Sequence, residues 1–347
     1  MWSIWNEPNQ PGWLRPQATG SLPESPRMFR ALQDAGYLGL QATGHGLDTY
    51  LLAETAPRGA LTVEERSPMR PLLFIRELYC VDRRLRPYTG DAAKVRGCPV
   101  DQAGRASFAA DHPGLFRATG WAHHPYALEV PPSVPDRIAD QVTLAVLPRL
   151  TQTLDGIFRT YGEGRRLPIW LTEYGYQTNP PDPIIGVSWK RQAAYLNEAE
   201  YMAFRRGRVR STAQFLLVDD GPKDSWPASD PRYWGSTFQS GLMTRDGTPK
   251  NAFAAYQLPV HVSPRRVRRG RKIRVFGGNR PAANAAMLPV AVEFRPRGSS
   301  SWQVVRRVTT GSYRNYVLVK LRARASGAYR LAWESGRSRS VSVAVVG

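Results

Sequence analysis

Two short apolar segments, each followed by a glutamate, constrain the fold of this chain more than any other feature. The first, residues 1–5, is followed by Asn6 and Glu7, and the second, residues 167–171, leads to Glu173. Each is short and apolar, as a buried strand is, and the first breaks at a proline. In barrels of alternating strands and helices, the side chains at the carboxyl ends of the strands gather on one face. We therefore expect Glu7 and Glu173 to lie close together.

A pair of carboxylates at strand ends is what cleavage of a glycosidic bond needs. One carboxyl group, protonated, donates to the leaving oxygen, and the other, ionised, attacks the anomeric carbon from the opposite face. A third motif, His124-Pro125-Tyr126, suits the same chemistry. Its imidazole can reach the substrate or the nucleophile. Its phenol can donate to a carboxylate oxygen, which would lower the pKa of Glu173 and keep it ionised.

Together the three motifs resemble glycoside hydrolase clan A, the retaining glycosidases built on TIM barrels, and are most similar to bacterial members near families 5 and 39. The resemblance spans residues 1 to about 257. It implies that Glu7 is the acid/base ending strand four and Glu173 the nucleophile ending strand seven, with His124 and Tyr126 after strand six. It also implies that Asn6 bonds the sugar 2-hydroxyl. The reading of both glutamates as structural carboxylates is the less favoured one.

The expected fold class is α/β: a partial (β/α)8 TIM barrel, strands 4 to 8 with their helices, over residues 1–258. Further barrel strands are expected at 49–54 and 212–218, with helices at 26–42, 72–85, 135–161 (interrupted at Pro148), 189–206 and 249–256 and an irregular stretch at 86–111. Strands one to three have no counterpart, so we expect an N-terminally truncated catalytic domain. Its open sheet edges would present unpaired backbone groups.

Loop residues supply further candidates for substrate binding. Trp13 can stack on a sugar ring or pack as part of a lid, and Glu54, at a strand end, can bond the substrate or belong to a local network. Tyr174 flanks the predicted site and either touches substrate or packs. Trp226 and Trp234 lie in the loop after the last barrel strand, where aromatic rings suit a sugar subsite.

No metal and no other cofactor is expected. His123 and His124 are adjacent on a strand and so point to opposite faces, and no cluster of cysteines or carboxylates stands at ligand spacing. Cys80 and Cys98 bracket a polar loop, and a disulfide is favoured over two unpaired thiols, since polysaccharide hydrolases are commonly secreted. No apolar run approaches the ~18 residues of a membrane helix, and no signal peptide is recognised.

The formal net charge of +20 is concentrated near the C-terminus. Residues 260–347 hold 19 Arg and Lys against Glu293 and Glu334, whereas the preceding 259 residues hold 29 basic and 26 acidic residues. Six short β-rich runs at sandwich-like spacing predict an immunoglobulin- or fibronectin-like β-sandwich of ~85 residues over 259–347; they are 272–276, 288–295, 302–308, 316–321, 328–333 and 340–346. Its basicity fits an anionic polymer as partner, but an inert Arg-rich spacer is favoured. Nucleic acid is not expected, because no motif for it is present.

The sequence thus predicts a secreted retaining O-glycoside hydrolase that acts on a poly- or oligosaccharide by double displacement. The alternative is an inactive truncated remnant that binds carbohydrate or a bacterial cell-wall polymer. Substitution of Glu173 separates the two, because an enzyme loses turnover whereas a binder keeps its affinity. The sugar and the linkage depend on loops and are not predicted.

Overall fold

The computed structural model describes residues 1–311 and 313–347 and divides into two compact units. The first unit comprises residues 1–174 and 206–214, and the second comprises residues 175–205 and 215–347. The second unit therefore contains the β-rich module together with two helices and loops that the sequence assigns to the barrel. The domain boundary between residues 258 and 259 stays a prediction.

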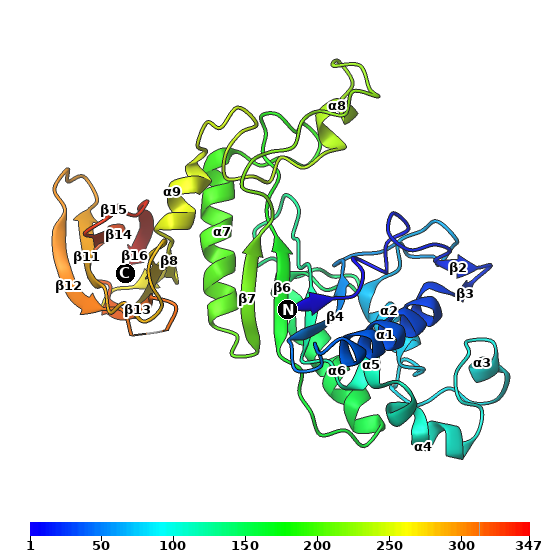
Figure 1. Ribbon diagram of the computed structural model, residues 1–347. Helices are drawn as coiled ribbons and strands as arrows, with labels where there is room; N and C mark the ends of the chain where they lie inside the picture. The colour runs from blue at the N-terminus through cyan, green and yellow to red at the C-terminus, as the bar shows by residue number, and fades with distance from the viewer. Residues whose placement is uncertain (312) are drawn as a thin grey trace. The chain divides into compact units, whose positions relative to one another are not determined.

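A curled, five-stranded parallel sheet, a half-barrel, is the centre of the first unit (Figure 1). Its order is β1-β4-β5-β6-β7, with strands at Trp2–Ser3, Tyr50–Thr55, Gly120–His123, Ile169–Tyr174 and Val209–Gln214. The order in the sheet follows the order in the chain, and every pairing is parallel. All carboxyl ends therefore lie at the same edge, which is the property that the predicted site requires. Mixed α/β architecture with a partial parallel barrel is confirmed.

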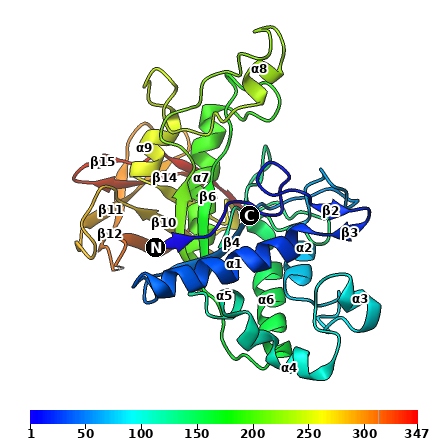
Figure 2. The same ribbon diagram turned by 45° about the vertical axis from the view of Figure 1, so that its right-hand side comes forward.

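Helices cover this sheet and supply part of its apolar core. They are α1 (Ser25–Ala42), α2 (Pro71–Leu78), α3 (Gly90–Lys94), α4 (Gln102–Asp111), α5 (Pro113–Phe116), the 3-10 turn η1 (Leu144–Val146) and α6 (Pro148–Thr160). Helix α1 packs on α2 and α5, and α2 packs on α6, beside the sheet in both views (Figure 1, Figure 2). The rings of Phe29, Phe74, Phe116 and Phe158 are fully buried between them. A small hairpin, β2 (Ala18–Thr19) and β3 (Leu22–Pro23), precedes α1.

Two predicted strands differ from the observed ones. The strand expected at residues 1–5 is only the two exposed residues of β1, because it pairs with β4 alone at the sheet edge and Trp5 has a left-handed backbone, with φ of 78°. The last strand, expected at 212–218, is β7 and ends at Gln214. Leu216 has φ of 69°, which an extended strand does not accommodate.

The helix predictions were partly wrong in the segments between strands. Residues 135–142 form turns instead of a helix, because Asp136 accepts a hydrogen bond from the Ile138 backbone and Asp140 has φ of 70°. The helix expected to reach residue 85 ends at Leu78. The stretch expected to be irregular contains α3 and α4, and Asp101 caps the start of α4, where its side chain accepts from the Gly104 backbone at 2.7 Å.

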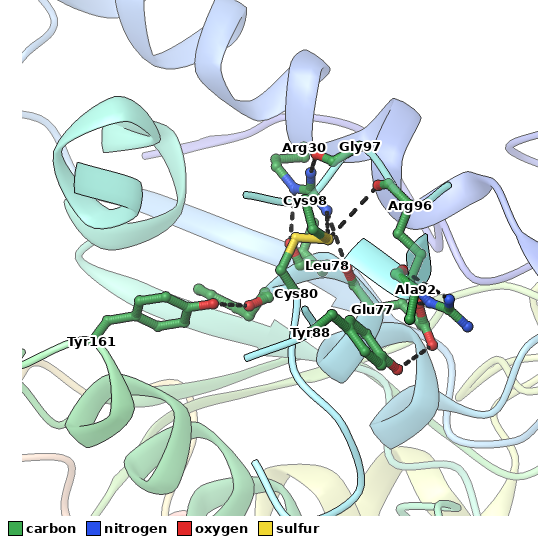
Figure 3. The surroundings of a disulfide bond; sticks show 11 residues. Arg30, Glu77, Leu78, Cys80, Tyr88, Ala92, Arg96, Gly97, Cys98 and Tyr161 are labelled. Atoms are coloured by element: carbon green, nitrogen blue, oxygen red, sulfur yellow. Dashed lines mark hydrogen bonds and ion pairs between the residues drawn. A yellow bond between two sulfur atoms is a disulfide. The ribbon is translucent and has the colours of Figure 1, made fainter. Parts of the chain in front are cut away.

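The predicted disulfide between Cys80 and Cys98 is present and ties the segment after α2 to the segment after α3 (Figure 3). Cys80 has φ of 57°, the left-handed conformation in which many helices end. The buried guanidinium of Arg30 joins both sides of the bridge: it donates to the carbonyl oxygen of Leu78 at 2.9 Å and to that of Gly97 at 2.9 Å. Burial lowers the pKa of Arg30 to about 10, so it remains charged.

We expect replacement of both cysteines by serine to destabilise the first unit. The bridge closes a loop with a sequence separation of 18, and chain-entropy models give about 3 kcal/mol for a loop of this length. Urea unfolding followed by far-UV circular dichroism should show a lower midpoint for the double variant. Dithiothreitol should lower the midpoint of the wild type and leave the double variant unchanged. Equal midpoints for oxidised wild type and variant would contradict this expectation.

The second unit combines helices and an all-β module. Its helices are α7 (Trp189–Phe204), α8 (Arg232–Gly235) and α9 (Asn251–Gln257). Helix α7 packs on α9 and on β8, and Asn197 joins them: its amide donates to the Ala255 carbonyl oxygen at 2.8 Å and its oxygen accepts from the Val260 backbone at 3.1 Å. Stacking of Tyr201 on His261 extends this contact.

The β-module consists of two layers around one apolar core, antiparallel throughout except for the parallel pairing of β16 with β9. One layer has the order β13-β10-β8 and the other β12-β11-β14-β16-β9, with β15 beside β14. The strands are β8 (Val260–Ser263), β9 (Arg266–Arg268), β10 (Lys272–Gly278), β11 (Pro289–Pro296), β12 (Gln303–Thr309), β13 (Tyr316–Arg322), β14 (Gly327–Trp333), β15 (Gly336–Arg337) and β16 (Val341–Val346). All six predicted strands are present. Within the described residues, no helix is long and apolar enough to cross a membrane.

Candidate active site

The loop after β1 holds Glu7 in place through a buried asparagine. The side-chain amide of Asn9 donates to the carbonyl oxygens of Met69 at 2.9 Å and Ala56 at 3.2 Å, and its oxygen accepts from the Ala56 backbone at 2.9 Å. Glu7 itself has φ of 37°, and Glu54 at the end of β4 has φ of 44°. Non-glycine residues held in this region cluster at functional sites, because the surrounding structure must compensate their strain.

His124 lies between the two glutamates. Its ring is fully buried, and Nδ1 lies 2.9 Å from Oε1 of Glu7 and 3.5 Å from Oε2 of Glu173. Its other nitrogen, Nε2, lies 3.1 Å from the hydroxyl of Thr172. A ring nitrogen and one oxygen of each glutamate lie within 4.8 Å of one another. Glu7, His124 and Glu173, taken from three separate segments of the sequence, therefore form one cluster.

Tyr126 fixes Glu173 from another direction. Its hydroxyl donates to Oε2 of Glu173 at 3.0 Å, as the His-x-Tyr pattern predicts. Burial, and then the charge of Glu173, raise the pKa of Tyr126, so the phenol stays protonated and remains a donor. Tyr174 is 2% exposed and its ring stacks on that of Tyr126, with centroids 6.2 Å apart. This burial favours a packing role for Tyr174, and its contact with substrate stays a prediction.

Glu173 holds its proton more tightly than an ordinary glutamate. Burial is the largest cause of its raised pKa, and the nearby carboxylates of Glu7 and Glu54 act in the same direction. His124 and the hydrogen bond from Tyr126 lower it, but by less. The hydrogen bond from Tyr126 lowers the pKa of Glu173, as the sequence predicts, but burial outweighs this contact and the net pKa is raised.

The other predicted binding residues are more dispersed. Asn6 is half-buried beside Glu7, and Trp13 is 54% exposed, with its carbonyl oxygen accepting from the indole of Trp5 at 2.9 Å. Trp226 and Trp234 belong to the second unit, where Arg232 lies over the Trp226 ring. Their contacts with a substrate stay predictions.

Two residues of the site were not predicted from the sequence: Asn9 and Thr172. Asn9 and Thr172 stand directly beside the two glutamate motifs, which is the only signal that marks them. Thr172 and Glu173 are neighbours on β6 and both reach His124, because the register of β6 is irregular between Leu171 and Tyr174. His123 bonds Thr55 and the Val142 carbonyl instead, and burial lowers its pKa to about 3, so it is neutral.

The same cluster has the donor spacing of a metal site. One imidazole and two carboxylates within 4.8 Å could hold a cation, and acidic groups are also found in this arrangement without one. Nδ1 of His124 is the ring nitrogen that faces the carboxylates, while Nε2 faces Thr172. The expectation of a metal-free site stays a prediction, and a chelator control tests it in the experiments below.

We expect Tyr126→Phe to raise the pKa of Glu173 further and Glu7→Gln to lower it. The first variant removes a hydrogen bond that favours the carboxylate, and the second removes a neighbouring negative charge. Carbon-13 NMR titration of labelled glutamate side chains measures both shifts. Tyr88→Phe is the matched control, since that phenol donates to Glu77 instead. A Glu173 pKa that both site variants leave unchanged would contradict the proposed balance of charges.

Stability should depend on pH through Glu173. Because its folded pKa is raised, the folded state binds this proton more tightly than the unfolded state between the unfolded and folded pKa values. The contribution of this group to the free energy of unfolding therefore falls as pH rises through that window. Glu173→Gln should remove the fall, which urea unfolding at several pH values would measure. Parallel pH profiles of the free energy of unfolding in the wild type and Glu173→Gln would contradict this expectation.

Comparisons with known proteins place few limits on this chain. No family model and no curated protein matches it. Among solved structures, a GH128 (subgroup I) endo-beta-1,3-glucanase from Amycolatopsis mediterranei is 19% identical with a TM-score of 0.29, over 65% of this chain and 78% of that chain. A beta-glucuronidase from Faecalibacterium prausnitzii is 16% identical with a TM-score of 0.26, over 39% and 20%. A predicted superoxide reductase from Thermotoga maritima is 13% identical with a TM-score of 0.24, over 27% and 91%. TM-scores this low do not establish a common fold.

Proposed function

We propose that this protein is a retaining O-glycoside hydrolase, with Glu7 as acid/base and Glu173 as nucleophile. The observation that carries the proposal is the approach of one oxygen of each glutamate to within 4.8 Å at the carboxyl edge of a parallel sheet. Retaining enzymes keep their carboxyl groups about 5–5.5 Å apart, whereas inverting enzymes need about 6.5–9.5 Å to admit a water molecule. The observed spacing favours the retaining mechanism.

The surroundings of the two carboxyl groups suit different roles. Oε2 of Glu173 accepts from Tyr126, which fixes the carboxylate and leaves Oε1 to attack the anomeric carbon. Glu7, beside the buried His124, donates a proton to the leaving oxygen in the same step. Attack converts Glu173 into a neutral ester and so removes a negative charge beside Glu7. Having given its proton to the leaving group, Glu7 is a carboxylate and can take the proton of the water that releases the product.

The resemblance to clan A extends this proposal to the substrate. By this resemblance, β1 and β4 to β7 correspond to strands four to eight of the barrel, and the substrate is a poly- or oligosaccharide. Asn6 would bond the 2-hydroxyl, and Trp13 would stack on a sugar ring, for which its exposed ring is accessible. Glu54 would bond the substrate or hold the site together, since its charge already acts on Glu173.

Kinetics of paired variants test the assigned roles. Glu173→Gln should lower kcat by about 10⁴-fold or more, and Glu7→Gln by about 10²–10⁴-fold, on aryl glycosides and polysaccharides. Added azide needs no general base, so it should restore Glu7→Ala with a glycosyl azide of retained configuration. Azide should also restore turnover in Glu173→Ala, but with a glycosyl azide of inverted configuration. Glu129→Gln removes an exposed carboxylate outside the site and is the matched control.

The outcomes separate an enzyme from its rivals. A wild type without turnover on any substrate, or site variants as active as Glu129→Gln, would overturn the proposal. Turnover abolished by EDTA and restored by a divalent cation would assign the cluster to a metal instead. Activity insensitive to EDTA, with the two azide products as stated, supports the double displacement.

A second candidate, a carbohydrate-binding protein without turnover, is favoured by one specific observation. Three indole rings near the first strand are exposed: Trp2 by 40%, Trp5 by 47% and Trp13 by 54%. Exposed aromatic faces stack on sugar rings whether or not a bond is cleaved. Calorimetric titration with oligosaccharides distinguishes the candidates, since a binder loses affinity in Trp13→Ala and shows no turnover in the wild type.

A further inference from the structure

A hollow of about 620 Å³ lies on the larger layer of the β-module, on the face opposite the core. Its floor is made of small residues of two neighbouring strands, Ala328 of β14 and Ser342 and Ala344 of β16. The residues that alternate with them, among them Tyr329 and Val343, belong to the apolar core. The floor therefore brings the sheet backbone within reach of a ligand.

Three arginines surround this floor. Arg295 is on β11, Arg297 follows it in the hairpin to β12, and Arg265 directly precedes β9, so they approach from both sides of the two central strands. No carboxylate is among the residues that line the hollow. Within the described part of the chain, none of the three guanidinium groups makes an ion pair within 4.0 Å, although Arg295 packs on the Trp302 ring at 4.8 Å.

The strand register shows that an arginine in the neighbouring row of this sheet face does have a carboxylate partner. Two residues before Arg295, Glu293 lies opposite Arg330 on β14 and accepts from its Nε at 2.6 Å. Arg295 instead lies opposite Ala328, which in turn lies opposite Ser342. The same sheet face thus carries a paired arginine in one row and an unpaired arginine above small neutral neighbours in the next.

We infer that this hollow binds the sulfate or carboxylate groups of an anionic polysaccharide. Guanidinium groups present planar pairs of N–H donors that match oxyanions, and the basic charge of the module attracts a polyanion at long range. The exposed hydroxyls of Ser299 and Ser342 add groups that can bond sugar hydroxyls. This inference concerns a different unit from the proposed active site and does not depend on it.

A polysaccharide fits the hollow better than nucleic acid does. Proteins that bind single strands stack bases on aromatic rings, and no aromatic residue lines this hollow. The nearby Trp302 ring is occupied by two cations, Arg295 at 4.8 Å and Arg330 at 4.1 Å. Nucleic acid and an inert spacer are therefore the competing outcomes of the test.

Binding of the full chain to dextran sulfate, polygalacturonate, uncharged dextran and a DNA duplex tests the inference. The hollow variant replaces Arg265, Arg295 and Arg297 by glutamine. The control variant makes the same replacement at Arg271, Arg274 and Arg324, which are exposed residues outside the hollow. Both variants lose the same charge, so a difference between them reports the site and not the net charge.

We expect the hollow variant to bind dextran sulfate or polygalacturonate about 10-fold or more weakly than the wild type, with a smaller salt dependence, and the control to lose about threefold or less. Uncharged dextran should not bind at this site. Equal losses in both variants, or no binding of either anionic polysaccharide, would overturn the inference. DNA that binds more tightly than the polysaccharides and depends on the same three arginines would overturn the choice of ligand.

A second variant guards against a folding defect. Ser342→Glu adds a carboxylate on the exposed floor and removes no packing contact of the core. It should weaken polysaccharide binding about as much as the triple variant while keeping the thermal midpoint of the wild type. Unchanged affinity in Ser342→Glu would contradict the placement of the ligand in this hollow.

Discussion

The buried imidazole of His124 is the interaction on which the rest of the site depends. Two glutamates facing each other would repel, and burial already makes the ionised form of Glu173 costly. His124 faces both carboxylates with one nitrogen, which lies 2.9 Å from Glu7 and 3.5 Å from Glu173. Thr172 holds the opposite nitrogen at 3.1 Å and fixes the ring between them. In the proposed mechanism this arrangement lets Glu7 act as acid/base and Glu173 as nucleophile.

The parallel sheet and its irregular strand ends bring these residues together. Strand order follows chain order, so β1, β5 and β6 each deliver at least one catalytic or supporting side chain to the same edge. The left-handed backbone at Glu7 and Glu54 turns the chain sharply there, and Asn9 anchors the first turn through three hydrogen bonds to neighbouring backbone groups. The regular strands position the site, and the left-handed residues at the strand ends orient its side chains.

Much of this arrangement could be predicted from the sequence, because each motif couples an apolar strand to a polar residue at its end. The five strands of the first unit and the six β-runs after residue 260 follow from local pattern, whereas the Cys80–Cys98 bridge was favoured because polysaccharide hydrolases are commonly secreted. The extent of β1 and β7 and the turns at 136–140 could not be predicted from local pattern, since they depend on single left-handed residues that leave no periodic signal. The raised pKa of Glu173 could not be predicted from local pattern either, because it depends on burial by the tertiary structure.

The stereochemistry of the first product tests the central claim most directly. Proton NMR of the anomeric signals, recorded before mutarotation, distinguishes the two mechanisms on a substrate that the wild type cleaves and Glu173→Gln does not. Double displacement through Glu173 predicts a first product with the configuration of the substrate. A first product of inverted configuration would mean that water attacks directly, and would contradict the assignment of Glu173 as the nucleophile.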